Sequence, residues 1–417
     1  MRLPKRSYFT YHPEISKAIA LLGLLTISIE TGSAQNALID LPVAPSGFSS
    51  ASSIFTRPPR KAEAGFSASG TLSSSYDSNV TQGDGSITAP RESDFILSPG
   101  ANIIYATEGR HWIFGANYGL NYDQYLEQDD YSGLNQKFSA FAGYRGGRFI
   151  LTYTNGFDAS RGVNRFYSVE GQQPIIETFS YQNILVGRYT LSPKTSIVGT
   201  ALLQNSDVQT KGYSDTSAFD ANLAALWSMS ALTDIGPGVR YTLRSGDNQQ
   251  DRTGIGPTLN LNYQLSTKVA VRSRIGVQFV ETDTTSDTAA TWSVAMKYQA
   301  SMLWSANLSL FRDSQADPSR PGVFNNVTTC RFGYQRKVRR LTLNTGINYE
   351  LNRREQTDED APANDYNYLT FDSSLLIPII SDDTDLILSV RYRDLSAKGD
   401  RVSWDGVQSG IGIAKRF

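Results

Sequence analysis

The sequence is poor in the residues that most enzymes use for catalysis and metal binding. Its 417 residues include one cysteine, Cys330, and two histidines, His12 and His111. A single cysteine cannot form an internal disulfide, and it shares its alternation with Phe332 and Tyr334, which predicts a small apolar filler rather than a reactive thiol. Two histidines are too few for most zinc sites and make histidine-based catalytic triads improbable. We therefore expect no enzymatic activity, no catalytic residues, no bound metal and no cofactor.

The chain also lacks long hydrophobic runs. Its mean hydropathy is −0.32 and 19% of its residues are charged. A helix that crosses a bilayer needs about 20 consecutive apolar residues. Only the N-terminus approaches this pattern, and its apolar run is too short. Transmembrane helices are therefore not expected.

The N-terminal segment is typical of a secretory signal peptide. Four basic residues precede an apolar run at 18–29, and the small residues Gly32, Ser33 and Ala34 follow before Gln35. This order predicts a signal peptide over 1–34 that is cleaved after Ala34; an uncleaved amphipathic anchor is the alternative. Residues 35–63 contain prolines among serine and alanine without a sustained period, which predicts a flexible periplasmic segment.

The charge balance argues against a nucleic-acid partner. The chain has 39 basic and 40 acidic residues, a net charge of −1. Residues 1–34 contain four basic and two acidic residues, so their removal would leave a net charge of −3. Proteins that bind nucleic acid usually carry an excess of positive charge to neutralise phosphates.

From residue 64 onward, runs of about ten or more residues alternate between apolar and polar side chains. In the clearest run, residues 112, 114, 116, 118, 120 and 122 are apolar or aromatic, while 115, 117, 119, 121 and 123 are glycine or polar. Similar runs occupy 268–279 and 341–352. Because successive side chains of a strand point to opposite faces, each run predicts a strand with one apolar and one wet face.

About eighteen such strands can be counted, or sixteen if two are misassigned. The expected ranges are 64–80, 93–106, 111–126, 133–145, 148–159, 173–190, 195–208, 215–229, 234–246, 252–265, 268–283, 288–301, 304–314, 322–336, 339–352, 364–379, 384–396 and 401–417. The connections between them alternate between short turns and longer polar loops. This alternation is typical of outer-membrane barrels, which place short turns in the periplasm and longer loops outside.

Hydrocarbon offers no hydrogen bonds, so strands cross it only in a closed sheet without edges. We therefore predict an all-β fold, a transmembrane antiparallel up-and-down β-barrel over 64–417 in the bacterial outer membrane. Tryptophan prefers the membrane interfaces, and the tryptophans fall near the expected strand ends, which predicts two girdles: Trp112, Trp227 and Trp304 at the short turns, and Trp292 and Trp404 at the loops. A soluble β-helix or propeller is the alternative, but its strands would be shorter.

Prolines within the expected strands need an explanation, because a closed barrel has no free edge to hold them. Pro99, Pro237 and Pro257 each adjoin a glycine, so we expect β-bulges there. An acidic stretch at 355–360 could bind Ca²⁺ or face the ions that bridge lipopolysaccharide, but it has no defined ligand spacing, so a solvated loop is expected. Asp77 and Asn79 carry the same two interpretations.

Two short motifs carry resemblances to known proteins. The last expected strand has Gly412 and ends on Phe417, which resembles the terminal signal read by the barrel assembly machinery, although Lys415 stands where that signal usually has a hydrophobic residue. The run SYDSNV at 75–80, followed by a polar loop, resembles the opening of the β-barrel porin 2 family. That resemblance implies a large outer-membrane barrel and, as in several members, a role in the export of surface polysaccharide.

A barrel of about eighteen strands encloses more space than its side chains fill, so a water-filled or plugged lumen is expected. The inward parity predicts a basic, amide-rich wall on neighbouring strands, to which a later strand adds two arginines: Arg240, Arg244, Asn260, Asn262, Arg272, Arg274, Arg391 and Arg393. Such a wall could guide an acidic polymer. The alternative is an ordinary lumen wall whose arginines pair with acids such as Asp220.

The function favoured by the sequence is a conduit for export of a surface polysaccharide. A passive diffusion porin is the alternative; it would usually have a long loop folded inward, and the loops here are short or moderate. The expected partners are outer-membrane lipid and lipopolysaccharide, the assembly machinery through Phe417, and periplasmic polysaccharide-export proteins.

Overall fold

The structure is a computed structural model that describes residues 65–163, 175–211, 213–246, 251–266, 268–282, 286–301, 303–316, 324–354, 365–379, 383–398 and 402–417. The expected signal peptide, the N-terminal segment at 35–63 and the acidic stretch at 355–360 lie outside these residues. In the described ranges, no helix is long and apolar enough to cross a membrane.

Eighteen strands account for nearly all of the regular structure. They are β1 Gly65–Asp77, β2 Asp94–Glu108, β3 Trp112–Tyr125, β4 Gly133–Gly146, β5 Phe149–Val163, β6 Ile175–Ser192, β7 Thr195–Val208, β8 Thr216–Ser230, β9 Thr233–Gly246, β10 Arg252–Ser266, β11 Val269–Glu281, β12 Ser286–Ser301, β13 Trp304–Ala316, β14 Phe324–Val338, β15 Leu341–Arg354, β16 Tyr366–Pro378, β17 Thr384–Ala397 and β18 Trp404–Arg416. One 3₁₀ turn, η2 Asp129–Tyr131, lies between β3 and β4. The strand ranges predicted from the alternation are confirmed to within a few residues.

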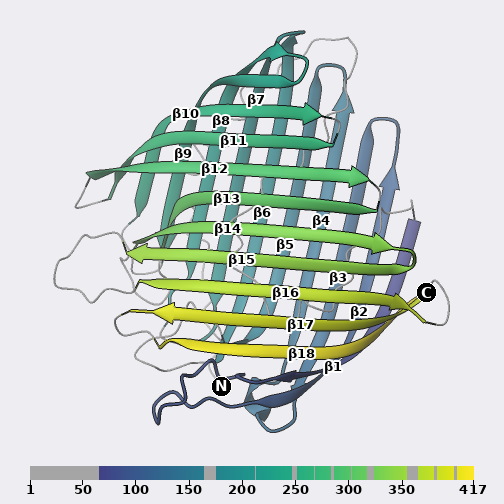
Figure 1. Ribbon diagram of the computed structural model, residues 1–417. Coiled ribbons are helices and arrows are strands. Elements are labelled where there is room, and N and C mark those ends of the chain that lie inside the picture. The colour runs from purple at the N-terminus through teal and green to yellow at the C-terminus, as the bar shows by residue number, and fades with distance from the viewer. Residues whose placement is uncertain are drawn as a thin grey trace, which may run out of the picture.

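The strands form one closed antiparallel barrel. Each strand pairs with its neighbours in sequence, and β1 pairs with β18 from Ser69 opposite Arg416 to Asp77 opposite Gln408. The number of strands is therefore eighteen, not sixteen. Figure 1 shows β10–β18 crossing in front of β2–β9 at a steep angle, as tilted strands on opposite walls of a barrel do. Among the described strands, no sheet edge is left to expose unpaired backbone groups.

Connections alternate in length around the barrel, so its two ends differ. Strands β2 and β3 are joined by residues 109–111 and β4 and β5 by 147–148, whereas β1 and β2 are joined by 78–93 and β3 and β4 by 126–132. The short connections all lie at one end, here called the turn end, and the longer ones at the other, here called the loop end. The start of β1 and the C-terminus lie at the turn end, where the Phe417 amide donates to the Ala68 carbonyl at 2.8 Å.

One face of each strand is apolar and points outward. On β11, Ile275 is 58% exposed and Phe279 is 60% exposed, while Gln278 between them is 3% exposed. An exposed apolar face over a shielded polar one is the reverse of a soluble protein and matches a lipid-facing barrel.

The expected bulges at Pro99, Pro237 and Pro257 are wrong. Pairing of β9 with β10 runs without a register shift from Arg252 opposite Arg244 to Tyr263 opposite Thr233. The register shifts instead fall at short turns, as between Gln264 and Ser266. Each proline points outward, and only individual ladder pairs beside it are missing. A lost donor is therefore tolerated locally without inserting a residue.

The tryptophan girdles are present in part. Trp112 and Trp227 are 61% and 58% exposed at the turn end, on the outward face. Trp404 is wrongly assigned to a girdle, because it is 4% exposed and packs inside the barrel with Tyr366, Tyr368 and Leu395. Its parity on β18 matches that of Gln408, which also faces inward.

Candidate functional site: the barrel interior

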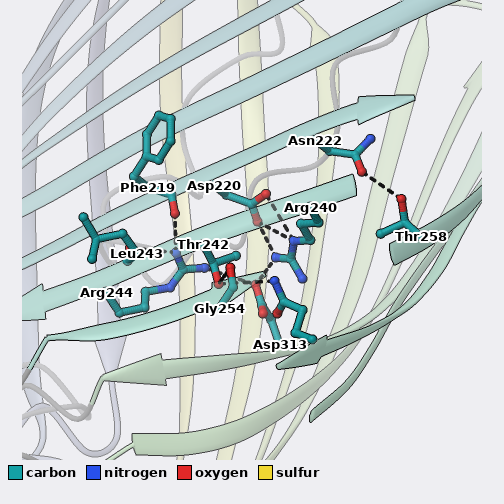
Figure 2. A network of polar contacts seen from close by, with 11 residues as sticks. Phe219, Asp220, Asn222, Arg240, Thr242, Leu243, Arg244, Gly254, Thr258 and Asp313 are labelled. Atoms are coloured by element: carbon teal, nitrogen blue, oxygen red, sulfur yellow. Dashed lines mark hydrogen bonds and ion pairs between the residues drawn. The ribbon is translucent and has the colours of Figure 1, made fainter. Parts of the chain in front are cut away.

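Two arginines of β9 reach across the interior to a carboxylate on β13. Arg240 donates to Asp313 Oδ2 at 2.7 Å, and Arg244 donates to the same oxygen at 3.3 Å (Figure 2). Strand β13 is four strands away from β9 around the barrel, so this contact is made through the lumen. Cα atoms of β9 and β13 approach within 8 Å. We call this contact the β9–β13 bridge; it narrows the interior at this level.

Both arginines also have partners on their own wall. Arg240 Nε donates to both oxygens of Asp220 on β8, at 3.2 and 3.0 Å. Arg244 Nη1 donates to the carbonyls of Phe219 and Leu243 at 3.0 and 3.2 Å. Both arginines are under 9% exposed, and a buried charge is stable only when it is paired and hydrogen-bonded. The shared partners therefore fix the guanidinium groups in place rather than leaving them free to contact a passing polymer.

Amide and hydroxyl side chains continue this network along β8, β10 and β11. Thr258 donates to Asn222 Oδ1 at 3.1 Å and accepts from Asn260 at 3.0 Å. Gln278 donates to Thr242 at 3.2 Å. Buried polar groups that satisfy one another in this way form a rigid wall.

Glycines allow the wall to bend sharply beside the bridge. A Cβ on Gly236 would lie 1.8 Å from the Ala225 carbonyl oxygen, and one on Gly256 would lie 1.8 Å from that of Val277. Cα atoms of β8 and β10, which are not direct neighbours, approach within 8 Å. Because only glycine permits this approach, the sheet can fold toward β13 at this point.

The other predicted residues of this wall are placed as follows. Arg274 lies opposite Asn260 and Arg272 opposite Asn262 in the β10–β11 register. Arg274 interacts electrostatically with Asp220, Arg240 and Asp313, so it belongs to the same group of charges. Arg272 and Asn262 lie closer to the turn end. The arrangement around Arg240 is the paired wall that the sequence offered as the alternative to a guiding surface.

Arg391 and Arg393 do not join this wall; they form a second group with β1 and β16. Arg391 Nε donates to Asp372 at 2.5 Å, and Arg393 Nη2 donates to the two oxygens of Asp77 at 2.8 and 2.6 Å. The Arg393 guanidinium lies 5.7 Å from the centre of the Trp404 ring, within the range of a cation–π contact. The predicted set therefore divides between two places in the barrel.

The SYDSNV run uses its alternate residues inside the barrel. Ser75 accepts a hydrogen bond from Gln408 at 3.2 Å, Asp77 binds Arg393, and Asn79 lies against the inward face of β18 at Gly406. Asn79 is fully buried and donates to the carbonyls of Gly83 and Asp405, each at 2.8 Å. Both hydrogen bonds that the Asn79 side-chain amide donates go to backbone carbonyls, so Asn79 acts as a structural anchor for this connection.

The anchor fixes the β1–β2 connection, residues 78–93, against β18. Val80 and Ala89 are 5% and 1% exposed, and Val80 donates to the Glu92 carbonyl at 2.8 Å. At the rim, Arg91 makes a bidentate pair with Asp405 at 3.0 and 3.1 Å. Hydrogen bonds from Ser86 lower the pKa of the exposed Asp84 carboxyl, so this residue stays ionised in the turn. A compact loop therefore lies against β18 at the loop end.

The interior is more open toward the turn end. On β11, β12 and β14, the inward residues Gln278, Thr291 and Thr329 toward the loop end are buried. Nearer the turn end, the inward residues Lys297, Asn307 and Gln335 are exposed. The narrow section thus lies in the loop half of this wall, at the level of the bridge.

Sequence reasoning missed Asp313, the Asp77–Arg393 pair and the inward aromatic residues. Asp313 shares the parity of Asn307 and Ser309, so the alternation predicts that its side chain points inward. The alternation does not predict its partner four strands away. Asp77 alternates with Ser75 and Asn79, a polar row on the inward side that was readable as well. The missing information was which inward side chains meet across the lumen.

The fold and its outward face together give the location. A closed eighteen-strand barrel with an apolar exterior and a polar, hydrogen-bonded interior satisfies every condition for crossing the bacterial outer membrane. The protein is an outer-membrane β-barrel.

Several solved structures with distant sequences are similar to this chain. No family model and no curated protein matches the chain. Among solved structures, it is similar to the FrpB iron transporter from Neisseria meningitidis (F3-3 variant), with 9% identity, 85% of this chain and 82% of that chain covered, and a TM-score of 0.44. It is also similar to OpdL from Pseudomonas aeruginosa (12%, 84% and 99%, 0.41) and OccAB3 from Acinetobacter baumannii (10%, 84% and 99%, 0.40). Similarity at this level carries no information about cargo, and the β-barrel porin 2 resemblance stays a prediction.

Proposed function

We propose that the protein is a passive diffusion channel for small hydrophilic solutes. The observation that carries this proposal is a polar interior that narrows at the β9–β13 bridge and has exposed inward residues toward the turn end. A narrow, charged section in an otherwise wide barrel limits the size of a solute while leaving a path for small ones. The compact loop at 78–93 adds a second restriction at the loop end.

The preference for a polysaccharide conduit rested on the β-barrel porin 2 resemblance, the basic wall and the lack of a loop folded inward. The connection at 78–93 weakens the argument from the loops, because Asn79 is buried against the inward face of β18. The paired state of Arg240 and Arg244 also leaves the basic wall less suited to guiding an acidic polymer. The passive channel is therefore the better-supported of the two functions.

Liposome swelling tests this proposal. Vesicles containing the purified barrel should swell in small sugars and amino acids, and the rate should fall steeply as the solute grows beyond a disaccharide. Vesicles with heat-denatured protein are the control. Equal exclusion of all solutes, together with loss of surface polysaccharide when the protein is deleted from its host, would favour the conduit instead.

A further inference from the structure

Two asparagines face the lipid at the middle of neighbouring strands. Asn155 on β5 and Asn183 on β6 lie directly opposite each other. Their strand neighbours on the same face, Tyr153 and Tyr181, are each 41% exposed, so this face points outward. The other outward amides in the described strands, such as Gln136 and Asn367, lie close to a strand end at the loop side.

The hydrogen bonds within the pair leave part of each amide unused. Asn155 Nδ2 donates to Asn183 Oδ1 at 2.8 Å, and the Tyr153 hydroxyl donates to the same oxygen at 2.7 Å. Among the described residues, Asn155 Oδ1 accepts no hydrogen bond and Asn183 Nδ2 donates none. At mid-depth in a bilayer, neither group has water to bind. An acceptor and a donor are thus presented side by side to the hydrocarbon.

Small residues lie near the pair, among larger ones such as Leu203, which is opposite Asn183, and the flanking Tyr153 and Tyr181. Ala140 lies opposite Asn155 on β4, Ala201 lies opposite Leu185 on β7, and Gly187 lies opposite Gly199. Small residues around a polar group are the pattern by which membrane segments pack against protein.

We infer that the outer face of β4–β7 is an interface with a second copy of this chain. The unused donor of Asn183 and the unused acceptor of Asn155 are complementary to each other. A symmetric neighbour that presents the same face therefore satisfies both chains, Asn183 of each copy donating to Asn155 of the other. Lipid chains cannot supply these bonds, and a different protein would need to reproduce the same spacing.

Cysteine cross-linking in the native outer membrane tests the interface. Cys330 is first replaced by Ser, which leaves a cysteine-free chain. A two-fold axis between Asn155 and Asn183 places the two Ala140 positions about three strand spacings, roughly 14 Å, apart. Ala140→Cys in that background should therefore be linked into a pair of this chain by a bis-maleimide of that reach. Ser373→Cys, on the outward face of β16, is the matched control and should stay uncross-linked.

A second pair of variants tests whether the amide groups themselves hold the two copies together. The double change N155L and N183L should convert the native oligomer in mild detergent to a monomer while leaving heat-modifiable migration intact. The control T345V and S373A removes another outward pair, whose hydroxyls lie 3.4 Å apart, and should not change the oligomer. A monomeric wild-type protein, or an A140C product whose mass is not a multiple of this chain, would overturn the inference. Neither result depends on conduction, so the proposed channel function is tested separately.

Discussion

At the scale of single residues, several buried arginines of the described interior are held in ion pairs. Arg240 and Arg244 on β9 bind Asp313 on β13, four strands away, and Arg393 on β17 binds Asp77 on β1, two strands away. Which inward residues are charged was predictable from parity. Their pairing was not, because it depends on how far the barrel folds inward at β9, which no single strand encodes.

Replacing Asp313 by Ala should open the narrow section. Arg240 and Arg244 lose the carboxylate that binds them across the lumen, so single-channel conductance should rise and the reversal potential in a salt gradient should shift toward anions. Removing one partner of a buried pair also costs about 3–5 kcal/mol of stability. Asp372→Ala is the control, because Asp372 is partly exposed and pairs only with an adjacent strand. Unchanged conductance in D313A would show that the bridge is not the restriction.

The Asp77–Arg393 pair should behave as one unit in a double-mutant cycle. Each single alanine variant leaves a buried charge without its partner, and should lose about 3–5 kcal/mol of unfolding free energy. The double variant should lose clearly less than the sum of the two, because neither charge is then left alone. Denaturant titration in detergent measures all four proteins. Additive losses would mean that the two side chains act independently.

At the scale of elements, strand positions followed from the sequence because the two-residue alternation and the turn residues are local. The Trp404 and proline predictions failed for a different reason. An apolar residue near a strand end can face either the lipid interface or a buried inner cluster, and Trp404 sits on the inward parity with Tyr366 and Tyr368. A proline whose nitrogen lies beside a missing ladder bond needs no bulge, as the continuous register around Pro257 shows.

The β1–β2 connection should limit solute size. Because the Val80 amide already bonds the Glu92 carbonyl, residues 81–91 can be replaced by an Asn-Gly turn without breaking the hairpin. The shortened protein should admit larger sugars in the swelling assay. Arg91→Ala alone should not, since its pair with Asp405 is exposed and worth little. If both variants keep the wild-type size limit, the loop does not restrict passage.

The bend at β9–β11 should depend on its glycines. A Cβ at Gly256 would collide with the Val277 carbonyl, so Gly256→Ala should reduce the amount of folded barrel in the membrane or raise the conductance by flattening the wall. Gly346→Ala is the control, because its Cβ would meet nothing closer than 3.9 Å. The measurement is the heat-modifiable band on unboiled gels. Equal amounts and equal conductance for both variants would contradict the bend.

At the scale of the whole molecule, the apolar parity specifies lipid on the outside, and the closed sheet follows from the need to pair every backbone group. The barrel and its location could therefore be predicted from the sequence alone. The interior departs from a simple cylinder, because two walls approach each other at the β9–β13 bridge and a loop lies against β18. Both features arise from contacts between residues far apart in the chain, such as Asn79 and Asp405.

Single-channel conductance of the purified protein in planar bilayers tests the central claim most directly. The account predicts a stable, open, ohmic pore in the wild-type protein, with a larger conductance in D313A and a further increase when residues 81–91 are also replaced. A wild-type barrel that stays closed, and that remains closed in both variants, would contradict a passive channel narrowed by the bridge and the loop.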